Sequence, residues 1–375
     1  GRTSHAAIVS RELGIPAIVG AGDATTTLED GDQVTVSCAE GDEGRVYSGI
    51  LPFQREEISV EKRSDTPVDI LMNLGNPGAA FRWWRLPVDG IGLARLEFII
   101  SESVGIHPMA LAHPERVQNK EVSAAIADRT RGFDSPSEYF VQQLVEGISR
   151  LAAVVYPHPA IVRTSDFKSN EYAALIGGSS FEPDEENPML GIRGAARYRS
   201  PRYKDAFLLE CEALRRVRDE VGLTNVVPMI PFCRTLDEAE GVLALMASAG
   251  LERGHNGLQI YVMCEVPSNV ILATEFAQLF DGFSIGTNDL TQLTLGVDRD
   301  SVELRDMFSE HDPAVRAMIT MVIERAHAAG RPVGLCGQAP SDDLDFARFL
   351  VDAGIDSRSL NPDSVMGVIE GLAGP

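Results

Sequence analysis

The sequence predicts an α/β protein built around a (β/α)8 TIM barrel, preceded by a smaller α/β unit. From residue 68 onward, short apolar runs rich in β-branched residues alternate with longer stretches of helix-forming sequence. Eight such runs lie between residues 68 and 375, and eight is the number of strands that closes a (β/α)8 barrel. An open, doubly wound sheet is the competing interpretation of the same alternation.

The predicted barrel strands are apolar through most of their length. They are Val68–Asn73, Gly90–Arg95, Ala160–Arg163, Val226–Pro231, Leu258–Cys264, Gly282–Gly286, Pro332–Cys336 and Ile355–Leu360. Between them, Asp237–Ala249 and Pro313–Ala329 are typical of helices. The spacings from residue 95 to 160 and from 163 to 226 are long, so we expect insertions with extra helices there.

Residues 1–50 predict a small α/β unit. A helix over residues 5–13 would be capped by Ser4 and stopped by Gly14, and Ile15–Val19, Gln33–Ser37 and Gly44–Tyr47 are predicted strands. These elements bury too little core for a separate domain, and no strand precedes the helix, so we expect a partial domain cut on its N-terminal side. The charged segment 51–67 predicts a linker, which leaves 68–375 for the barrel.

Composition excludes several classes of protein. The chain has 55 acidic residues against 33 Lys and Arg, a net charge of −22, which argues against a nucleic-acid partner. No apolar run approaches the ~18 residues that would indicate a membrane span, and no secretory signal pattern is present. The five cysteines include no C-x-x-C pair, so neither a zinc site nor a disulfide framework is indicated, and a reducing, cytoplasmic location fits best.

Chemistry-bearing residues follow most of the predicted strands. In a TIM barrel, the carboxyl ends of the strands form the rim that carries the active site. We therefore expect these residues to converge there: Arg95 with Glu97 beyond it, Arg163 through Asp166, Glu265, Thr287 through Asp289, Cys336 through Gln338, and Asn361.

Arginines and carboxylates on this rim predict a site for an anion and a divalent cation. Arg95 and Arg163 suit bidentate binding of phosphate, and Arg299 can reach the same rim. Glu265 and Asp289 supply the oxygen ligands that Mg2+ prefers. Taken singly, a strand-end arginine can equally be a surface salt-bridge residue and each carboxylate a helix cap. Their joint occurrence on one rim favours the site.

Cys336 and His5 are the candidate catalytic groups. A thiol beside a cation and arginines can move a proton, although a lone strand-end cysteine can equally be buried filler. His5 lies in the first turn of the predicted N-terminal helix, where free N–H groups and the helix dipole would stabilise a phosphoryl group on the imidazole. The alternative is a histidine at a helix start with no such role.

Long motifs resemble those of the PEP-utilising enzymes. Gly1–Gly20 is similar to their phosphohistidine signature, with His5 at the phosphorylated position. Four further segments resemble blocks of their PEP/pyruvate-binding barrel: Ile91–Phe98, Met263–Asn269, Phe283–Asp300 and Gly334–Gln338. Within the family, Ile161–Gly178 and Glu185–Tyr198 are most similar to the phosphoenolpyruvate synthase (pyruvate, water dikinase) branch.

The resemblance implies a C-terminal fragment that lacks the N-terminal ATP-binding domain of this branch. In the relay it implies, ATP phosphorylates His5 through that missing domain. The histidine domain then swings on the 51–67 linker and delivers the phosphoryl group to pyruvate in the barrel. The overall reaction would be ATP + pyruvate + water giving AMP + PEP + phosphate. A cytoplasmic homodimer, with no nucleic-acid or membrane partner, is also implied.

The resemblance also implies a role for each matched residue. The phosphoryl group would be held by Arg95, Arg163, Arg299 and Asn288, Glu265 and Asp289 would bind Mg2+ and with it the pyruvate oxygens, and Cys336 would move the methyl proton. Arg193 is a further candidate. Two alternatives stay open: a phosphotransferase like enzyme I, against which the DFKSNEY segment speaks, and a non-catalytic PEP- or pyruvate-binding module.

Overall fold

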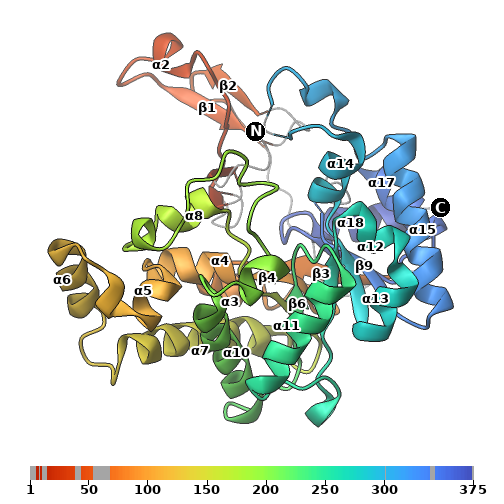
Figure 1. Cartoon of the computed structure of the whole chain (residues 1–375). Coiled ribbons are helices and arrows are strands. Elements are labelled where there is room, and N and C mark those ends of the chain that lie inside the picture. The colour runs from red at the N-terminus through yellow and green to blue at the C-terminus, as the bar shows by residue number, and fades with distance from the viewer. Residues whose placement is uncertain are drawn as a thin grey trace.

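Eight parallel strands close into a barrel in the computed structural model, which describes residues 6–7, 9–10, 15–38, 44–53, 68–299, 301–337 and 343–373. Each strand pairs with its neighbours in chain order, and β10 closes the ring by pairing with both β9 and β3. Helices surround this ring (Figure 1). The predicted TIM barrel is confirmed, and closure of the sheet excludes the doubly wound alternative.

All eight predicted strands are confirmed, with ends up to three residues shorter than the apolar runs. Their bounds are β3 Asp69–Asn73, β4 Ile91–Arg95, β5 Ala160–Arg163, β6 Val226–Ile230, β7 Tyr261–Cys264, β8 Gly282–Ile285, β9 Val333–Leu335 and β10 Ser357–Leu360. Strands of a parallel barrel are buried by side chains inside and by helices outside, which is why they read as continuous apolar runs.

Helices connect the strands on the outside of the barrel. From β3 to β6 they are η1 Pro77–Ala79, α3 Ala80–Trp83, α4 Leu96–Phe98, η2 Ile99–Val104, α5 Pro108–Ala112, η3 Pro114–Arg116, α6 Lys120–Arg129, α7 Pro136–Val155, α8 Ser169–Ala173, η4 Gly178–Ser180, α9 Ala195–Arg199 and α10 Lys204–Asp219. After β6 they are α11 Leu236–Ser248, η5 His255–Gly257, α12 Pro267–Ile271, α13 Ala273–Leu279, α14 Thr287–Leu295, η6 Arg305–Met307, α15 Pro313–Ala328, α17 Leu344–Asp352 and α18 Val365–Ala373. The long β4–β5 and β5–β6 connections hold the extra helices expected from their spacing.

The core has two layers, one inside the barrel and one between the barrel and its helices. The inner layer is small and contains a thiol and two thioethers: its buried members are Leu71, Leu93, Ile161, Val227, Met229, Met263 and Cys336. The outer layer is much larger and joins the outward side chains of the strands to the helices. The inner layer is the floor beneath the carboxyl-end rim.

The N-terminal unit contains a two-stranded antiparallel sheet and the short helix α2 Ala24–Thr27. Strands β1 Val34–Ser37 and β2 Arg45–Ser48 confirm the predicted strands Gln33–Ser37 and Gly44–Tyr47, and they pair in the register Val34↔Ser48. The predicted strand Ile15–Val19 is wrong, because this segment finds no partner strand among the described residues and forms no ladder. His5, Gln338 and residues 54–67 of the predicted linker lie outside the described residues.

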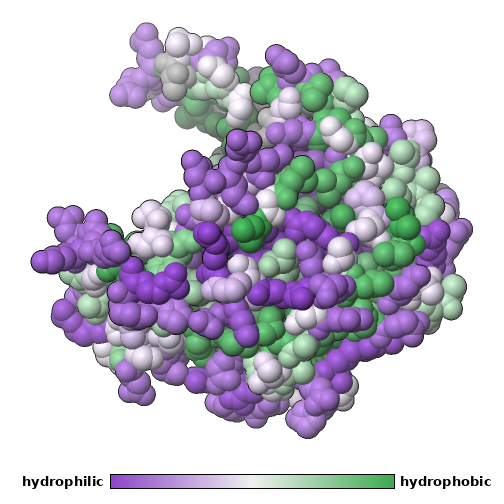
Figure 2. All heavy atoms as spheres, viewed as in Figure 1, coloured by the Kyte–Doolittle hydropathy of each residue, from purple (hydrophilic) through white to green (hydrophobic). Residues whose placement is uncertain are grey.

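The described helices include none that is both long enough and apolar enough to span a bilayer. Hydrophilic side chains cover much of the face shown in Figure 2, with smaller hydrophobic areas between them. This surface accords with the large excess of acidic residues over basic ones.

Candidate active site

The strand register brings the predicted residues to one rim of the barrel. Arg95 and Arg163 are the last residues of β4 and β5, and they lie opposite each other in the register of these two strands. Glu265 directly follows β7, and Asp289 lies in the first turn of α14, after β8. Cys336 directly follows β9. Because all eight strands run parallel, these five residues lie at the same end of the barrel.

Three carboxylates meet at the centre of this rim. Oxygen atoms of Asp166, Glu265 and Asp289 lie within 4.8 Å of one another, and all three side chains are buried. Glu265 Oε1 accepts a hydrogen bond from the Phe232 N–H at 2.7 Å. Among the described residues, none donates a hydrogen bond to the buried Asp289 Oδ1. A set of hard oxygen ligands with an unused acceptor fits Mg2+ better than a softer metal.

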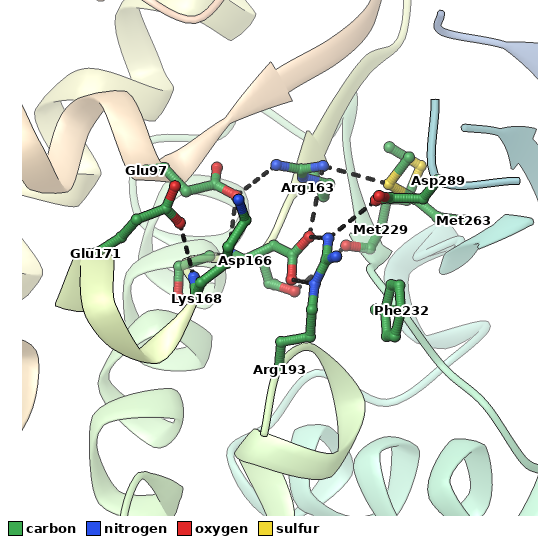
Figure 3. A network of polar contacts seen from close by, with 12 residues as sticks. Glu97, Arg163, Asp166, Lys168, Glu171, Arg193, Met229, Phe232, Met263 and Asp289 are labelled. Atoms are coloured by element: carbon green, nitrogen blue, oxygen red, sulfur yellow. Dashed lines mark hydrogen bonds and ion pairs between the residues drawn. The ribbon is translucent and has the colours of Figure 1, made fainter. Parts of the chain in front are cut away.

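Arg193 neutralises part of this charge. Its Nη2 lies 2.7 Å from Asp166 Oδ2 and 3.0 Å from Asp289 Oδ2, and its Nε donates to Asp166 Oδ1 at 3.1 Å. Figure 3 shows the guanidinium between the two carboxylates, with the ring of Phe232 beside it. One arginine therefore ties the end of β5 to the start of α14.

Arg163 is held on the opposite side of Asp166. Its Nη2 donates to Glu97 Oε1 at 2.5 Å, and the same oxygen accepts the Asp166 N–H at 2.7 Å. Its Nη1 lies 3.8 Å from Asp166 Oδ2. The Arg163 Nε is buried and donates to no partner among the described residues, so this guanidinium keeps a donor for a ligand.

The remaining predicted residues are Arg299, Asn288 and Arg95. Arg299 approaches the carboxylates, with its Nη1 3.7 Å from Asp289 Oδ1 and a buried Nε that donates to none of the described residues. Asn288 is half-buried in the first turn of α14. Arg95 is half-buried, and its guanidinium carbon lies 5.8 Å from the ring centre of Phe98.

Burial and charge separate the pKa values of the two carboxylates after β7 and β8. Burial, reinforced by the nearby charges of Asp289 and Asp166, raises the pKa of Glu265 to about 8. Burial also acts to raise the pKa of Asp289, but Arg193 and Arg299 outweigh it and the net pKa is lowered. In the absence of a cation, Glu265 therefore holds a proton at neutral pH while Asp289 is charged.

Cys336 lies on the floor of the site as a buried thiol. Its Sγ is 3.6 Å from the Ile285 carbonyl oxygen and packs within the inner core layer. Burial raises the pKa of the Cys336 thiol, against the opposing effects of a hydrogen bond with Ser284 and of the charges of Arg163 and Arg95. The sulfur is thus protonated at neutral pH, which suits a proton donor rather than a resting nucleophile.

Sequence reasoning underrated Asp166, Arg193 and Glu97. Asp166 is three residues past a strand end, which is a usable signal, and Glu97 is two residues past another. Arg193 lies in an irregular segment far from any strand end, and its partners are 27 and 96 residues away in the chain. No local sequence pattern indicates a contact between residues so far apart in the chain.

Comparison with known proteins agrees with the resemblance found in the sequence. Residues 54–373 match the family model described as PEP-utilising enzyme, PEP-binding domain, and residues 1–41 match that of the PEP-utilising enzyme, mobile domain. The phosphoenolpyruvate synthase of Synechocystis sp. is 57% identical over all of this chain and 46% of its own length. That of Escherichia coli is 56% identical over 98% of this chain and 46% of its own length.

The chain therefore spans about half the length of the curated relatives it matches. Among solved structures, an HpcH/HpaI aldolase/citrate lyase family protein from Burkholderia cenocepacia is 14% identical, with a TM-score of 0.44 over 81% of this chain and 91% of that one.

Proposed function

The chain belongs to the PEP-utilising enzymes, and from that premise we propose that its barrel carries out the PEP/pyruvate half of a phosphotransfer reaction. In the synthetic direction, the phosphoryl group of phosphorylated His5 passes to the enolate oxygen of pyruvate and forms PEP. One observation carries this proposal: buried carboxylates, partly unpaired arginines and a protonated thiol share one rim, in a segment that matches a PEP-binding domain.

The arginines are proposed to bind the phosphoryl group. Phosphoryl transfer depends mainly on positioning and on neutralising charge at the equatorial oxygens. Arg163 and Arg299 each keep a buried Nε–H without a partner among the described residues, and both face the carboxylate cluster. Arg95, from the end of β4, and Asn288, from the first turn of α14, complete the proposed set.

Glu265 and Asp289 are proposed to bind Mg2+, with Asp166 beside them. When bound, Mg2+ would offset negative charge and polarise the substrate oxygens. The protein's part is to hold these acidic groups close together out of water. Arg193 reduces the repulsion between Asp166 and Asp289 that such crowding creates.

Cys336 is proposed to carry the proton at the substrate methyl carbon. When PEP is consumed, the bond between phosphorus and the enol oxygen breaks and a bond from phosphorus to an imidazole nitrogen of His5 forms. The enolate carbon then takes the proton of Cys336 Sγ and becomes the methyl group of pyruvate. In the opposite direction, the thiolate recovers that proton. A raised thiol pKa keeps the proton on sulfur until the enolate forms.

The wider reaction is proposed for a longer protein. ATP would phosphorylate His5 through a domain outside these 375 residues, giving AMP, phosphate and PEP overall. We also propose a cytoplasmic homodimer, and light scattering of the purified chain tests the dimer directly.

The decisive experiment is incubation of the chain with PEP labelled in its phosphoryl group, in the presence of Mg2+. We expect an acid-labile label on the protein and one pyruvate released for each label bound. His5→Ala is expected to abolish the label while PEP binding persists. Label that survives in His5→Ala would refute the assignment of His5, and PEP binding without any transfer would indicate a binding module instead.

A further inference from the structure

The segment that carries Arg193 has no regular secondary structure. Residues 185–194, here called the Arg193 loop, lie between η4 and α9 and include no helix or strand residue. No helix or sheet hydrogen bonds fix the main chain there. The position of Arg193 therefore depends on contacts that side chains make with this segment. The turn between β6 and α11, residues 231–235, supplies such contacts.

Arg234 binds three carbonyl groups of this loop. Its guanidinium donates to Gly191 O at 2.6 Å, Arg193 O at 3.3 Å and Leu190 O at 3.4 Å. The planar fork of an arginine can satisfy several acceptors at once, which a single ammonium cannot do in the same geometry. Arg234 thus binds three of the four carbonyl groups of residues 190–193, and the fourth, that of Ile192, accepts a hydrogen bond from Arg197 Nε at 3.0 Å.

The main chain of Arg234 is itself held by hydrogen bonds to both its N–H and its carbonyl oxygen. Its N–H donates to Glu238 Oε2 and its carbonyl oxygen accepts from Ser268 Oγ, each at 2.7 Å. Its guanidinium carbon lies 4.6 Å from the ring centre of Phe232, and that of Arg193 lies 4.0 Å from the same ring. The β6–α11 turn is therefore a firm base against which the Arg193 loop is held.

The Arg193 side chain needs this support because it makes two contacts that must be satisfied together. Its Nη2 bridges carboxylates that come from different strand ends, and hydrogen bonds of this length weaken steeply when donor or acceptor is displaced. A shift of the loop main chain would move the guanidinium away from at least one carboxylate. The cluster would then keep more of its negative charge.

We propose that Arg234 is a positioning residue, which places Arg193 between Asp166 and Asp289 by holding the main chain of the Arg193 loop. Arg234 makes no hydrogen bond or ion pair with the three carboxylates in any described contact, although its charge also acts on Asp166 from a longer distance. The positioning effect passes through Arg193, and Arg234→Lys, which keeps the charge, separates it from that longer-range effect. The functional meaning of this placement rests on the proposed function, but the placement itself can be measured without catalysis.

The test is a double-mutant cycle read by Mn2+ binding to the full chain without substrate, measured by electron paramagnetic resonance. Arg193→Met removes a cation a few ångströms from the carboxylates, so Mn2+ affinity is expected to rise by about tenfold. Arg234→Gln is expected to raise it severalfold, and the double variant no further than Arg193→Met alone. Arg234→Lys, which keeps the charge but not the fork, is expected to lie between wild type and Arg234→Gln.

Arg199→Gln is the matched control. Arg199 joins α9 to the start of α11 through Asp237 and bonds no carbonyl of the Arg193 loop, so its Mn2+ affinity should equal that of the wild type. The proposal is wrong if the changes in Mn2+ affinity caused by Arg234→Gln and Arg193→Met add in the double variant. It is also wrong if both Arg234 variants bind Mn2+ as the wild type does.

Phosphoryl transfer from labelled PEP separates this inference from the proposed function. If the wild type transfers the label, Arg234→Gln should slow transfer and Arg199→Gln should not. If the wild type transfers no label but the Mn2+ cycle behaves as expected, the proposed function fails and the positioning role stands. If Arg234→Gln does not fold, the same Mn2+ comparison between Arg234→Lys and wild type decides the role of Arg234.

Discussion

Replacing Glu210 by glutamine should remove a pH dependence from the stability of the protein. Glu210 lies on α10, fully buried, and accepts hydrogen bonds from Ser165 N at 3.0 Å, Ser165 Oγ at 2.5 Å and Tyr203 OH at 2.9 Å. All three donors are neutral. Burial raises the pKa of Glu210 to about 7, from an ordinary value of 4.5.

The sign and size of the effect follow from these two pKa values. Between pH 4.5 and 7 the folded protein holds the Glu210 proton and the unfolded chain releases it, so stability falls as pH rises through this range and is level above it. At about 1.4 kcal/mol for each pH unit, the loss is on the order of 3 kcal/mol. Glu210→Gln keeps the shape without the titration, so its stability relative to wild type should rise by this amount from about pH 4.5 to about pH 8.

Urea unfolding followed by tryptophan fluorescence at several pH values measures this difference. Glu212→Gln, two residues along the same helix, is the control. Hydrogen bonds from Arg215 and Arg216 outweigh burial and lower the pKa of Glu212, so its stabilising effect is present at neutral pH and is lost as pH falls. The two variants should therefore diverge from wild type in opposite directions. Parallel profiles for Glu210→Gln and wild type would refute the reasoning.

Three further predictions concern the site and the loop beside it. Cys336→Ala should abolish exchange of the pyruvate methyl protons with deuterium, followed by NMR, while PEP binding is largely retained; loss of both together would indicate a structural thiol instead. Asp289→Asn should weaken Mn2+ binding at least about tenfold, because a charged oxygen ligand is lost; unchanged binding in a titration would place the cation elsewhere. Gly194→Ala should cost about 2 kcal/mol in unfolding, because Gly194 has φ +57° and a Cβ there would meet the Pro231 carbonyl oxygen at 2.4 Å; an unchanged urea midpoint would contradict this.

The barrel could be predicted because its determinants are local. Each strand is a short apolar run bounded by turn residues, and both faces of a parallel strand are buried, so the signal does not depend on which strands become neighbours. The Ile15–Val19 segment shows the limit of the same signal. It is as apolar as the barrel strands, but a strand also needs a partner, and the pairs formed by the described residues leave this segment outside any ladder.

The site could be predicted only in part, because strand-end positions are local properties of the sequence and contacts between distant side chains are not. Parallel strands of a closed barrel all end at one rim, and this rule places Arg163, Glu265, Asp289 and Cys336 together on the strength of their strand-end positions alone. The rule does not say which arginines form ion pairs with carboxylates of the protein itself. Arg163 forms such a pair with Glu97 within the site, but the sequence shows only that both residues are charged.

The sequence by itself determined the barrel, its carboxyl-end rim and the kinds of chemical group on that rim, because strand pattern and strand-end position are local properties. Only the tertiary structure decided that Arg193 lies between Asp166 and Asp289, that Arg234 holds its loop, and that the Cys336 thiol keeps its proton. These outcomes depend on burial and on contacts between residues far apart in the chain. Neither is encoded in a local run of residues, since both arise only when the eight strands close.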